Sequence, residues 1–405
     1  YLDSGEPPGR WFGLGAAQLG LDGVLDDEEF LAVMAGEHPT TGEQLGRRFG
    51  ETSVRGFDAT FSAPKSVSVL FAVGDEHLRA HLTKAHDRAV DAVLSWVESQ
   101  AHTRLRWRGH VVCVDTEGIV AGVFRQHTSR RLDPQLHTHA VIANRVKAPD
   151  GRWLALDART IKMDQRTLSG LYHAGLRAEL TRRLGVRWHQ PENGIAEMVG
   201  VDPVVLAEFS QRNRDIEQRV GEKLDRFRTD LGREPTGRER WRLEREAVLD
   251  SRPAKTHGHA AGELHAGWRS RLRGLGHEPH DLVVGTVGRV RRATGIDQAT
   301  VTGMVEGALE ALTERQSTWR PAELVRELAA QVPTDVTVEP DRLCSFLQDL
   351  ADHIAADRCV DLSPPIPAGA VLRRDGRPPS EAAVDRALTT EAILEEEERI
   401  VEWAQ

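Results

Sequence analysis

The stretch Phe124-Arg-Gln-His-Thr-Ser-Arg-Arg-Leu-Asp-Pro-Gln-Leu-His-Thr-His-Ala-Val-Ile-Ala-Asn144 carries the pattern that decides the fold. In it, His137 and His139 are followed at once by the apolar run Ala140 to Ala143. Residues two positions apart share a face on a strand, whereas on a helix they point about 200° apart. Because the apolar run favours a strand, the sequence predicts a sheet with both imidazoles on one face.

Neighbouring segments alternate in the same way and predict the rest of this sheet. In Gly56-Phe-Asp-Ala-Thr-Phe-Ser62 the apolar residues fall on one face and the polar residues on the other. Further strands are predicted at His110–Val114, Ile119–Arg125, Leu136–Lys147 and Arg152–Asp157, with hairpin turns at Asp115–Gly118 and Pro149–Gly151. With helices predicted over 77–100 and 168–184, these five strands indicate an α+β fold, in which helices cover one largely antiparallel sheet.

The rest of the composition sets the class and compartment of the protein. A length of 405 residues exceeds one domain of roughly 100 to 200 residues. The three cysteines lie far apart, which excludes a disulfide framework and a thiolate zinc site and favours the reducing cytoplasm. No apolar run reaches about 18 residues, so no membrane insertion is expected. Because the chain begins with Tyr1 rather than Met, we expect a piece of a longer protein.

The net charge of −9 conceals a basic block in the middle of the chain. Between Ala121 and Gln190 there are thirteen Lys and Arg against five Asp and Glu. A block of this kind is able to follow a phosphate backbone, although a solvated surface has the same composition. The polar residues just ahead of the histidine pair, Thr128 to Arg131, are donors that suit a strand bearing phosphate contacts.

Three motifs resemble those of conjugative relaxases of the TrwC/TraI (MobF) type, within the HUH endonuclease superfamily. They are Phe57-Asp-Ala-Thr-Phe-Ser-Ala-Pro-Lys-Ser-Val-Ser68, Thr128-Ser-Arg130 and Asp133-Pro-Gln-Leu-His-Thr-His-Ala140. The resemblance spans roughly residues 1–275. It implies the relaxase palm, a five-stranded antiparallel sheet with flanking helices, followed by helical regions.

The resemblance also implies a domain order. We expect a relaxase (DNA strand-transferase) domain over 1–275, a mainly helical region over 276–361, a linker over 362–388, and the start of a helicase-like domain over 389–405. The segment after Leu362 is rich in Pro, Gly and Arg, as linkers are. No G-x-x-x-x-G-K-[ST] motif occurs, so the ATP-driven motor itself lies outside this sequence.

The resemblance implies metal-dependent nicking and rejoining of DNA. In such relaxases a tyrosine attacks one phosphodiester at the transfer origin of a plasmid or integrative element and leaves a 5′-phosphotyrosine. The implied partners are single-stranded or hairpin DNA at that origin, together with the relaxosome and the coupling proteins of type IV secretion. The implied location is the cytoplasm, with transfer of the protein alongside the DNA to the recipient cell.

The resemblance assigns roles to particular residues. His137 and His139 occupy two of three metal positions, and Asp58 occupies the position of the acid that orients a metal histidine and assists the tyrosine. An ungapped register places Gln126 at the third metal position, whereas a bulge would bring His127 there. Mg²⁺ or Mn²⁺ is expected with an amide ligand, and Zn²⁺ is the alternative. DNA contacts are expected from the side chains of Arg130, Lys65 and Ser62.

The nucleophile is the least determined part of the site. Tyr1 resembles a member of the second of the family's two tyrosine clusters, so we expect the principal nucleophile upstream of this sequence. Tyr172, the remaining tyrosine, lies in a helical pattern typical of a core residue. Two other functions stay open: a rolling-circle replication initiator, which shares the His-x-His sheet, and a non-catalytic DNA-binding module with a structural metal.

Overall fold

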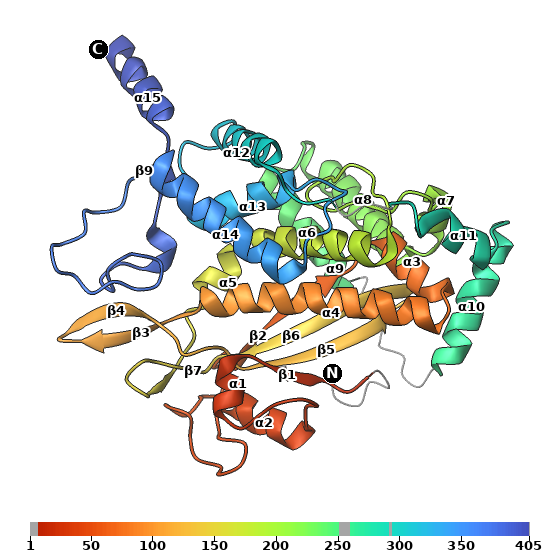
Figure 1. The fold of residues 1–405 in the computed structure, drawn as a ribbon, viewed down its shortest axis with the longest axis horizontal. Helices are drawn as coiled ribbons and strands as arrows, with labels where there is room; N and C mark the ends of the chain where they lie inside the picture. Colours follow the sequence, from red (N-terminus) through yellow and green to blue (C-terminus); the bar gives the residue numbers. More distant parts are fainter. Residues whose placement is uncertain (1–6, 251–259, 291–293, 405) are drawn as a thin grey trace.

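The computed structural model describes residues 7–250, 260–290 and 294–404. Its centre is a four-stranded antiparallel sheet in the order β1-β5-β6-β2 (Figure 1). These strands are β1 (Arg10–Phe12), β2 (Gly56–Ser62), β5 (Ala121–Thr128) and β6 (Pro134–Ala143). The strand that bears the histidine pair, β6, lies between β5 and β2, so both of its edges are paired.

The expectation of five strands in one sheet is wrong, because predicted strands form hairpins of their own. Strand β4 (His110–Asp115) pairs with β3 (His102–Trp107) and not with β5. The turn between them is Arg108-Gly109, where both φ angles are positive, at 48° and 86°, as a two-residue hairpin turn requires. Residues 115–118, the predicted turn, instead link the β3–β4 hairpin to the main sheet.

The hairpin at Pro149–Gly151 and strand β1 also differ from the predicted sheet. The predicted hairpin at Pro149–Gly151 is present, but it is small and separate, with β7 (Val146–Lys147) paired to β8 (Trp153–Leu154). The fourth strand of the main sheet, β1, was not predicted, because three residues are too few to display an alternating pattern.

Helices cover one face of the main sheet. They are α3 (Lys65–Val73), α4 (Glu76–Ser99) and α6 (Gln165–Leu184), and the last two confirm the predicted long helices. Helix α4 begins where the side chain of Asp75 accepts a hydrogen bond from the backbone N–H of Leu78 at 2.8 Å. Its apolar stripe enters one buried cluster with α3, α6 and the sheet. Burial of this face sets which side chains β2 and β6 direct to the opposite one.

Within the described ranges, apolar helices cover the opposite face of the sheet at one end. There α1 (Leu14–Gln18) and α2 (Asp27–Ala35) enclose a second, smaller apolar cluster that includes Phe124 of β5 and Val141 of β6. His139 is the next residue of β6 on this face, directly opposite Phe124. The histidine pair therefore begins where this apolar cover stops.

The C-terminal half is helical and packs on the helices of the sheet (Figure 1). The remaining elements are α5 (Arg159–Met163), α7 (Pro203–Glu208), α8 (Gln211–Leu231), α9 (Gly237–Asp250), α10 (Ala261–Gly274), α11 (Pro279–Thr286), α12 (Gln298–Thr313), α13 (Pro321–Gln331), α14 (Pro340–Asp357), β9 (Val360–Asp361), η1 (Ala383–Asp385), β10 (Leu388–Thr389) and α15 (Glu391–Ala404). The indole N–H of Trp96 on α4 donates to the side-chain oxygen of Gln348 on α14 at 2.8 Å. No described helix is long and apolar enough to cross a membrane.

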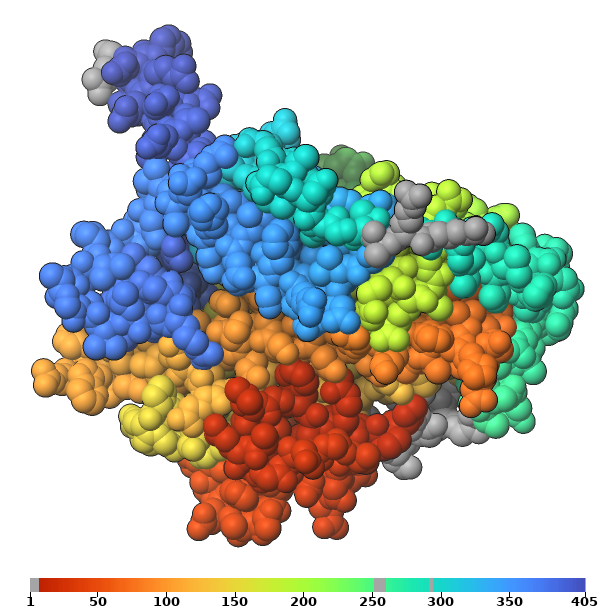
Figure 2. All heavy atoms as spheres, in the orientation of Figure 1, coloured from red at the N-terminus to blue at the C-terminus, as the bar shows by residue number. Residues whose placement is uncertain are grey.

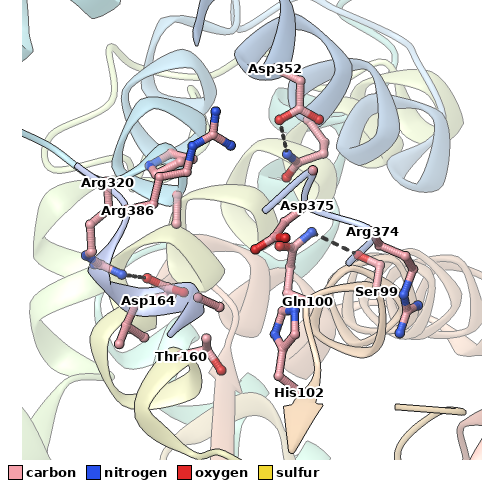
Figure 3. A pocket seen from close by; sticks show the side chains of 16 residues that line it. Ser99, Gln100, His102, Thr160, Asp164, Arg320, Asp352, Arg374, Asp375 and Arg386 are labelled. Atoms are coloured by element: carbon pink, nitrogen blue, oxygen red, sulfur yellow. Dashed lines mark hydrogen bonds and ion pairs between the residues drawn. The ribbon is translucent and has the colours of Figure 1, made fainter. Parts of the chain in front are cut away.

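A cleft of about 520 Å³ lies between the helices of the sheet and the C-terminal half (Figure 3). Arg320 crosses this seam to form an ion pair with Asp164. Arg374 crosses it from the expected linker, where its backbone N–H donates to the carboxylate of Asp115 at 2.9 Å. The segment 362–388 contains little regular structure, but it is folded against the β3–β4 hairpin by such contacts.

Replacement of Leu347 by Ala tests whether the two halves share one core. Leu347 on α14 is fully buried in the same apolar cluster as α4. The substitution is expected to lower the free energy of unfolding of the whole chain by about 2–5 kcal/mol, measured by urea denaturation. The control Leu362→Ala, at a residue that is 46% exposed, should change it by less than about 0.5 kcal/mol. An unchanged midpoint for Leu347→Ala would contradict a shared core.

Candidate metal centre

His137 and His139 project from the same face of β6. Their ring centroids lie 5.2 Å apart, with the ring planes at 74°. In the register with β2, Ser62 lies opposite His137 and Thr60 opposite His139, so the polar face of β2 adjoins the two rings. His137 is buried and His139 is partly exposed. The structure therefore brings the two imidazoles together on one strand face, next to a polar edge.

Both histidines have a fixed orientation, because each Nδ1 atom meets an acceptor. Nδ1 of His137 lies 2.9 Å from the backbone oxygen of Gln135, which can only accept a hydrogen bond. Nδ1 of His139 lies 3.0 Å and 3.1 Å from the two carboxylate oxygens of Asp58, and 3.1 Å from the hydroxyl of Thr60. With Nδ1 protonated, the lone pair of a neutral imidazole resides on Nε2. A histidine backed in this way by a carboxylate or carbonyl is typical of metal ligands.

Gln126 faces the histidine pair and His127 does not. Gln126 lies directly opposite His137 in the β5–β6 register, so the two side chains share a face. The register shifts between Gln126 and Thr128, yet His127 stacks on Phe71 of helix α3, with ring centroids 4.9 Å apart and planes at 16°. The structure thus places His127 on the helix-covered side of the sheet.

The side chains at the pair fit a divalent metal. Among the described residues no group of three or more His, Cys, Asp or Glu is arranged to hold an ion, so the pair is not joined there by a third side chain of these four types. Gln126 supplies an amide, whose buried Nε2 atom makes no hydrogen bond with any residue of the described chain. Because amide oxygen and nitrogen exchange places on a flip of the side chain, this position suits a ligand oxygen equally well.

A cleft of about 550 Å³ runs along strand β2, and it reaches the histidine pair only through Asp58 and Thr60, which contact His139 and line the cleft. It is lined by Asp58, Ser62 and Lys65, with α6 on the other side. The ammonium of Lys65 already donates a hydrogen bond to the backbone oxygen of Pro134 at 3.0 Å, and burial lowers the pKa of this lysine. Arg130 lies apart from this lining, half-buried in the turn between β5 and β6. Ser62 therefore adjoins the candidate centre, Lys65 lies in the cleft along β2, and Arg130 belongs to the loop between β5 and β6.

A family model described as TrwC relaxase matches residues 1–275. The chain belongs to the TrwC relaxase family. It is 33% identical over 288 residues to the multifunctional conjugation protein TraI of Escherichia coli, which is 69% of this chain and 15% of that protein. The chain therefore spans only a small part of its curated relative.

Solved structures of the conjugative relaxase TrwC resemble the chain closely. Its metal-bound complex with oriT DNA is 33% identical, with a TM-score of 0.59, over 69% of this chain and 92% of that one. Its complex with a 27-mer DNA that comprises the recognition hairpin and the cleavage site is also 33% identical, with a TM-score of 0.58, over 67% of this chain and 92% of that one. A copper-bound complex of TrwC with oriT DNA is 34% identical, with a TM-score of 0.58, over 67% of this chain and 89% of that one.

This TrwC-family chain has two tyrosines, of which Tyr172 lies within the described residues. Tyr1 lies outside the described residues. Tyr172 is fully buried on α6, as its helical pattern predicted, and its hydroxyl lies 2.7 Å from Nδ1 of His86. Nε2 of His86 in turn lies 2.7 Å from the hydroxyl of Thr138, which stands between His137 and His139 on β6. Tyr172 thus belongs to a buried polar chain that supports β6 from behind, and burial raises its pKa well above the usual value.

Two buried bases on α6 were missed from the sequence. His173 lines the cleft, and burial, reinforced by the positive charge of Arg177, lowers its pKa to about 4. Burial also lowers the pKa of Arg177 to about 10, and its Nε and Nη2 atoms make no hydrogen bond within the described chain. Neither residue stands in a motif, and their burial arises only when α6 packs beneath residues 194–197. Thr60, by contrast, was recognisable from strand alternation, because it shares the face of Asp58 and Ser62.

The lowered pKa of His173 predicts a loss of stability in acid. Its folded pKa lies below the unfolded value of about 6.5, so the neutral ring stabilises the fold above that pH, and this contribution is lost as the pH falls towards about 4. His173→Gln should reduce the loss between about pH 7 and pH 5 by on the order of 2 kcal/mol, in urea unfolding at each pH. His86 acts in the same direction, so some slope should remain.

A substitution on the surface provides the control for this pH dependence. His110 is exposed on β4, and His110→Gln should leave the slope of stability against pH as it is in the parent chain. If His173→Gln and His110→Gln gave equal slopes, His173 would not be the buried neutral base described above.

Proposed function

We propose that this chain is the relaxase part of a conjugation protein, which nicks and rejoins one DNA strand at a transfer origin through a 5′-phosphotyrosine. The observation that supports it most directly is the imidazole pair of His137 and His139, each with Nδ1 fixed by an acceptor. Asp58, the acceptor of His139, also lines the cleft along β2. Its TrwC relatives are described in complex with oriT DNA, which supports single-stranded or hairpin origin DNA as the substrate.

His137, His139 and the side-chain oxygen of Gln126 would hold a divalent ion, with Mg²⁺ or Mn²⁺ preferred and Zn²⁺ as the alternative. The ion would draw charge from the non-bridging oxygens of the scissile phosphate. Asp58 keeps the ring of His139 in its ligating tautomer and orientation. TrwC itself is described in metal-bound and copper-bound forms, which supports a metal at this place without selecting the ion.

The strand transfer needs an accessible phenol. In the proposed step the tyrosine oxygen forms a bond to phosphorus, the phenolic proton passes to a base, and the 3′ oxygen leaves and takes up a proton. The reverse step reseals the strand without ATP, because the phosphoester is conserved. Tyr172 is too deeply buried for this role. Of this sequence's tyrosines, Tyr1 is therefore the candidate, and Asp58 is the carboxylate placed at the metal centre to assist it.

We extend the same proposal to the domain order, the partners and the place of action. Residues 1–275 form the relaxase domain, 276–361 a helical region, 362–388 a linker and 389–405 the start of a helicase-like domain. The partners would include relaxosome components and type IV coupling proteins, and the place of action would be the cytoplasm. Family membership favours conjugation over a rolling-circle initiator, and the cleft that Asp58 and Thr60 line favours catalysis over a structural metal.

Strand cleavage is the direct test of this function. A labelled single strand that spans the transfer origin should yield a covalent protein–DNA adduct through Tyr1 in Mg²⁺ or Mn²⁺, at a low rate because Tyr1 resembles the second of the family's two tyrosine clusters, and EDTA should abolish it. His137→Ala and His139→Ala should each lower the rate by at least about a hundredfold, because each removes a ligand. His127→Ala is the matched control and should retain activity. Adduct formation that persists in EDTA, or equal loss in all three variants, would refute the assignment.

Substitution of Gln126 tests the third ligand separately. Gln126→His places an imidazole opposite His137 and should raise the affinity for Zn²⁺ by about tenfold or more relative to Mg²⁺, measured by competition with a chelator. Asp58→Asn should weaken binding by about 10- to 100-fold, because His139 loses its charged acceptor. If Gln126→His leaves the zinc affinity unchanged, this side chain does not reach the ion.

A further inference from the structure

The β3–β4 ribbon, residues His102–Asp115, has features that metal-dependent strand transfer does not use. Six consecutive residues at its tip, 106–111, are exposed. Figure 2 shows the ribbon (orange) at the left edge of the molecule, below the folded C-terminal loop (blue). The tip therefore extends beyond the body of the protein, where a partner has access to it.

The base of the ribbon is rigidly attached, in contrast to its tip. The backbone N–H of Asp157 donates to the oxygen of His102 at 2.8 Å, and the hydroxyl of Thr103 donates to the oxygen of Ala155 at 2.7 Å. On the other strand, the N–H of Cys113 donates to the oxygen of Pro379 at 2.7 Å. With six register pairs between the strands, the tip is held out as a stiff arm rather than a loose loop.

Beyond Asp115 at its base, the charge on this ribbon is of one sign. Arg104, Arg106 and Arg108 stand on it, and no Asp or Glu occurs between residues 102 and 114. Arg104 is near Asp157, at 3.5 Å, but Arg106 and Arg108 form no ion pair within the described chain. In a protein of net charge −9, Arg106 and Arg108 are therefore positive charges that no carboxylate of the described chain compensates, as phosphate-binding surfaces require.

The tip also exposes large apolar side chains. Trp107 is 62% exposed and Val111 is 56% exposed, and the guanidinium of Arg108 lies 5.9 Å from the centroid of the Trp107 ring. An exposed indole costs free energy in water unless a partner covers it. An aromatic ring flanked by arginines is the surface on which unpaired bases stack while their phosphates are neutralised.

We propose that the tip of the β3–β4 ribbon binds single-stranded DNA, with a base stacked on Trp107 and phosphates neutralised by Arg106 and Arg108. This inference rests on the proposed relaxase function, which supplies an unpaired strand next to the nick. Charge selects a polyanion, and the exposed indole selects bases that are not already stacked in a duplex. The ribbon would hold the strand at a second point, remote from the metal.

Binding measurements on the whole 405-residue chain test the proposal. Fluorescence anisotropy with a labelled oligothymidylate should show about tenfold weaker binding for Trp107→Ala, since one stacked base is lost. The double variant Arg106→Ala/Arg108→Ala should reduce the slope of log affinity against log salt by about 1.4, which is 0.7 for each phosphate contact. Arg152→Ala, at an exposed arginine on the neighbouring β7–β8 hairpin, is the matched control and should bind as the parent does.

Three outcomes would overturn the proposal. The first is that Trp107→Ala binds oligothymidylate as the parent chain does. The second is that Trp107→Ala weakens binding to a duplex of the same length equally. The third is that it weakens binding to vesicles of anionic lipid and leaves binding to oligothymidylate unchanged. Failure of the relaxase function itself is distinguishable, because His137→Ala should abolish the adduct while it leaves oligothymidylate binding intact. Trp107→Ala should in turn keep metal affinity and unfolding midpoint unchanged, since its ring touches neither the core nor the metal centre.

Discussion

The antiparallel register between β2 and β6 is the constraint on which the candidate centre depends. It sets Thr60 opposite His139 and thereby puts Asp58 on the same face, within hydrogen-bonding distance of that ring. Because side chains alternate with a period of two, a slip of one residue would turn both histidines to the helix-covered side. The slip is opposed by residues such as Phe61, which alternate with the polar ones and are buried against Tyr172.

The two faces of β6 therefore have different surroundings: one is buried against helices and the other carries the histidine rings. On the helix side, Thr138 is bonded to His86, and His86 to Tyr172, so this polar chain is satisfied without water. A buried polar network of this kind is costly when incomplete and specific when complete, and it fixes the strand from behind. On the open side, the rings can then be directed by short contacts to a carbonyl and a carboxylate, because the backbone that carries them does not shift.

Much of this was predictable from the sequence, since it follows from local patterns. The alternation of Gly56–Ser62 and the apolar run after His139 gave the strands, their faces and the histidine pair. The sheet's strand count was not predictable in the same way, because Arg104 and Arg106 hide strand β3 from a pattern based on apolar residues, and β4 was then assigned the wrong neighbour. The packing of His173 and Arg177 depends on residues 194–197, which no local pattern links to α6.

The proposed third ligand, Gln126, would have a consequence for the chemistry of a bound ion. Gln126, His137 and His139 are all neutral donors, so a bound dication would keep its full charge towards the substrate phosphate. The nearest carboxylate, Asp58, acts on the ion only through the ring of His139, which makes that ring more basic without placing a negative group against the incoming phosphodiester. An acidic ligand would offset the attraction that draws a polyanion to the site. An amide in place of a third imidazole keeps this charge balance and makes the site harder, which suits oxygen-seeking ions.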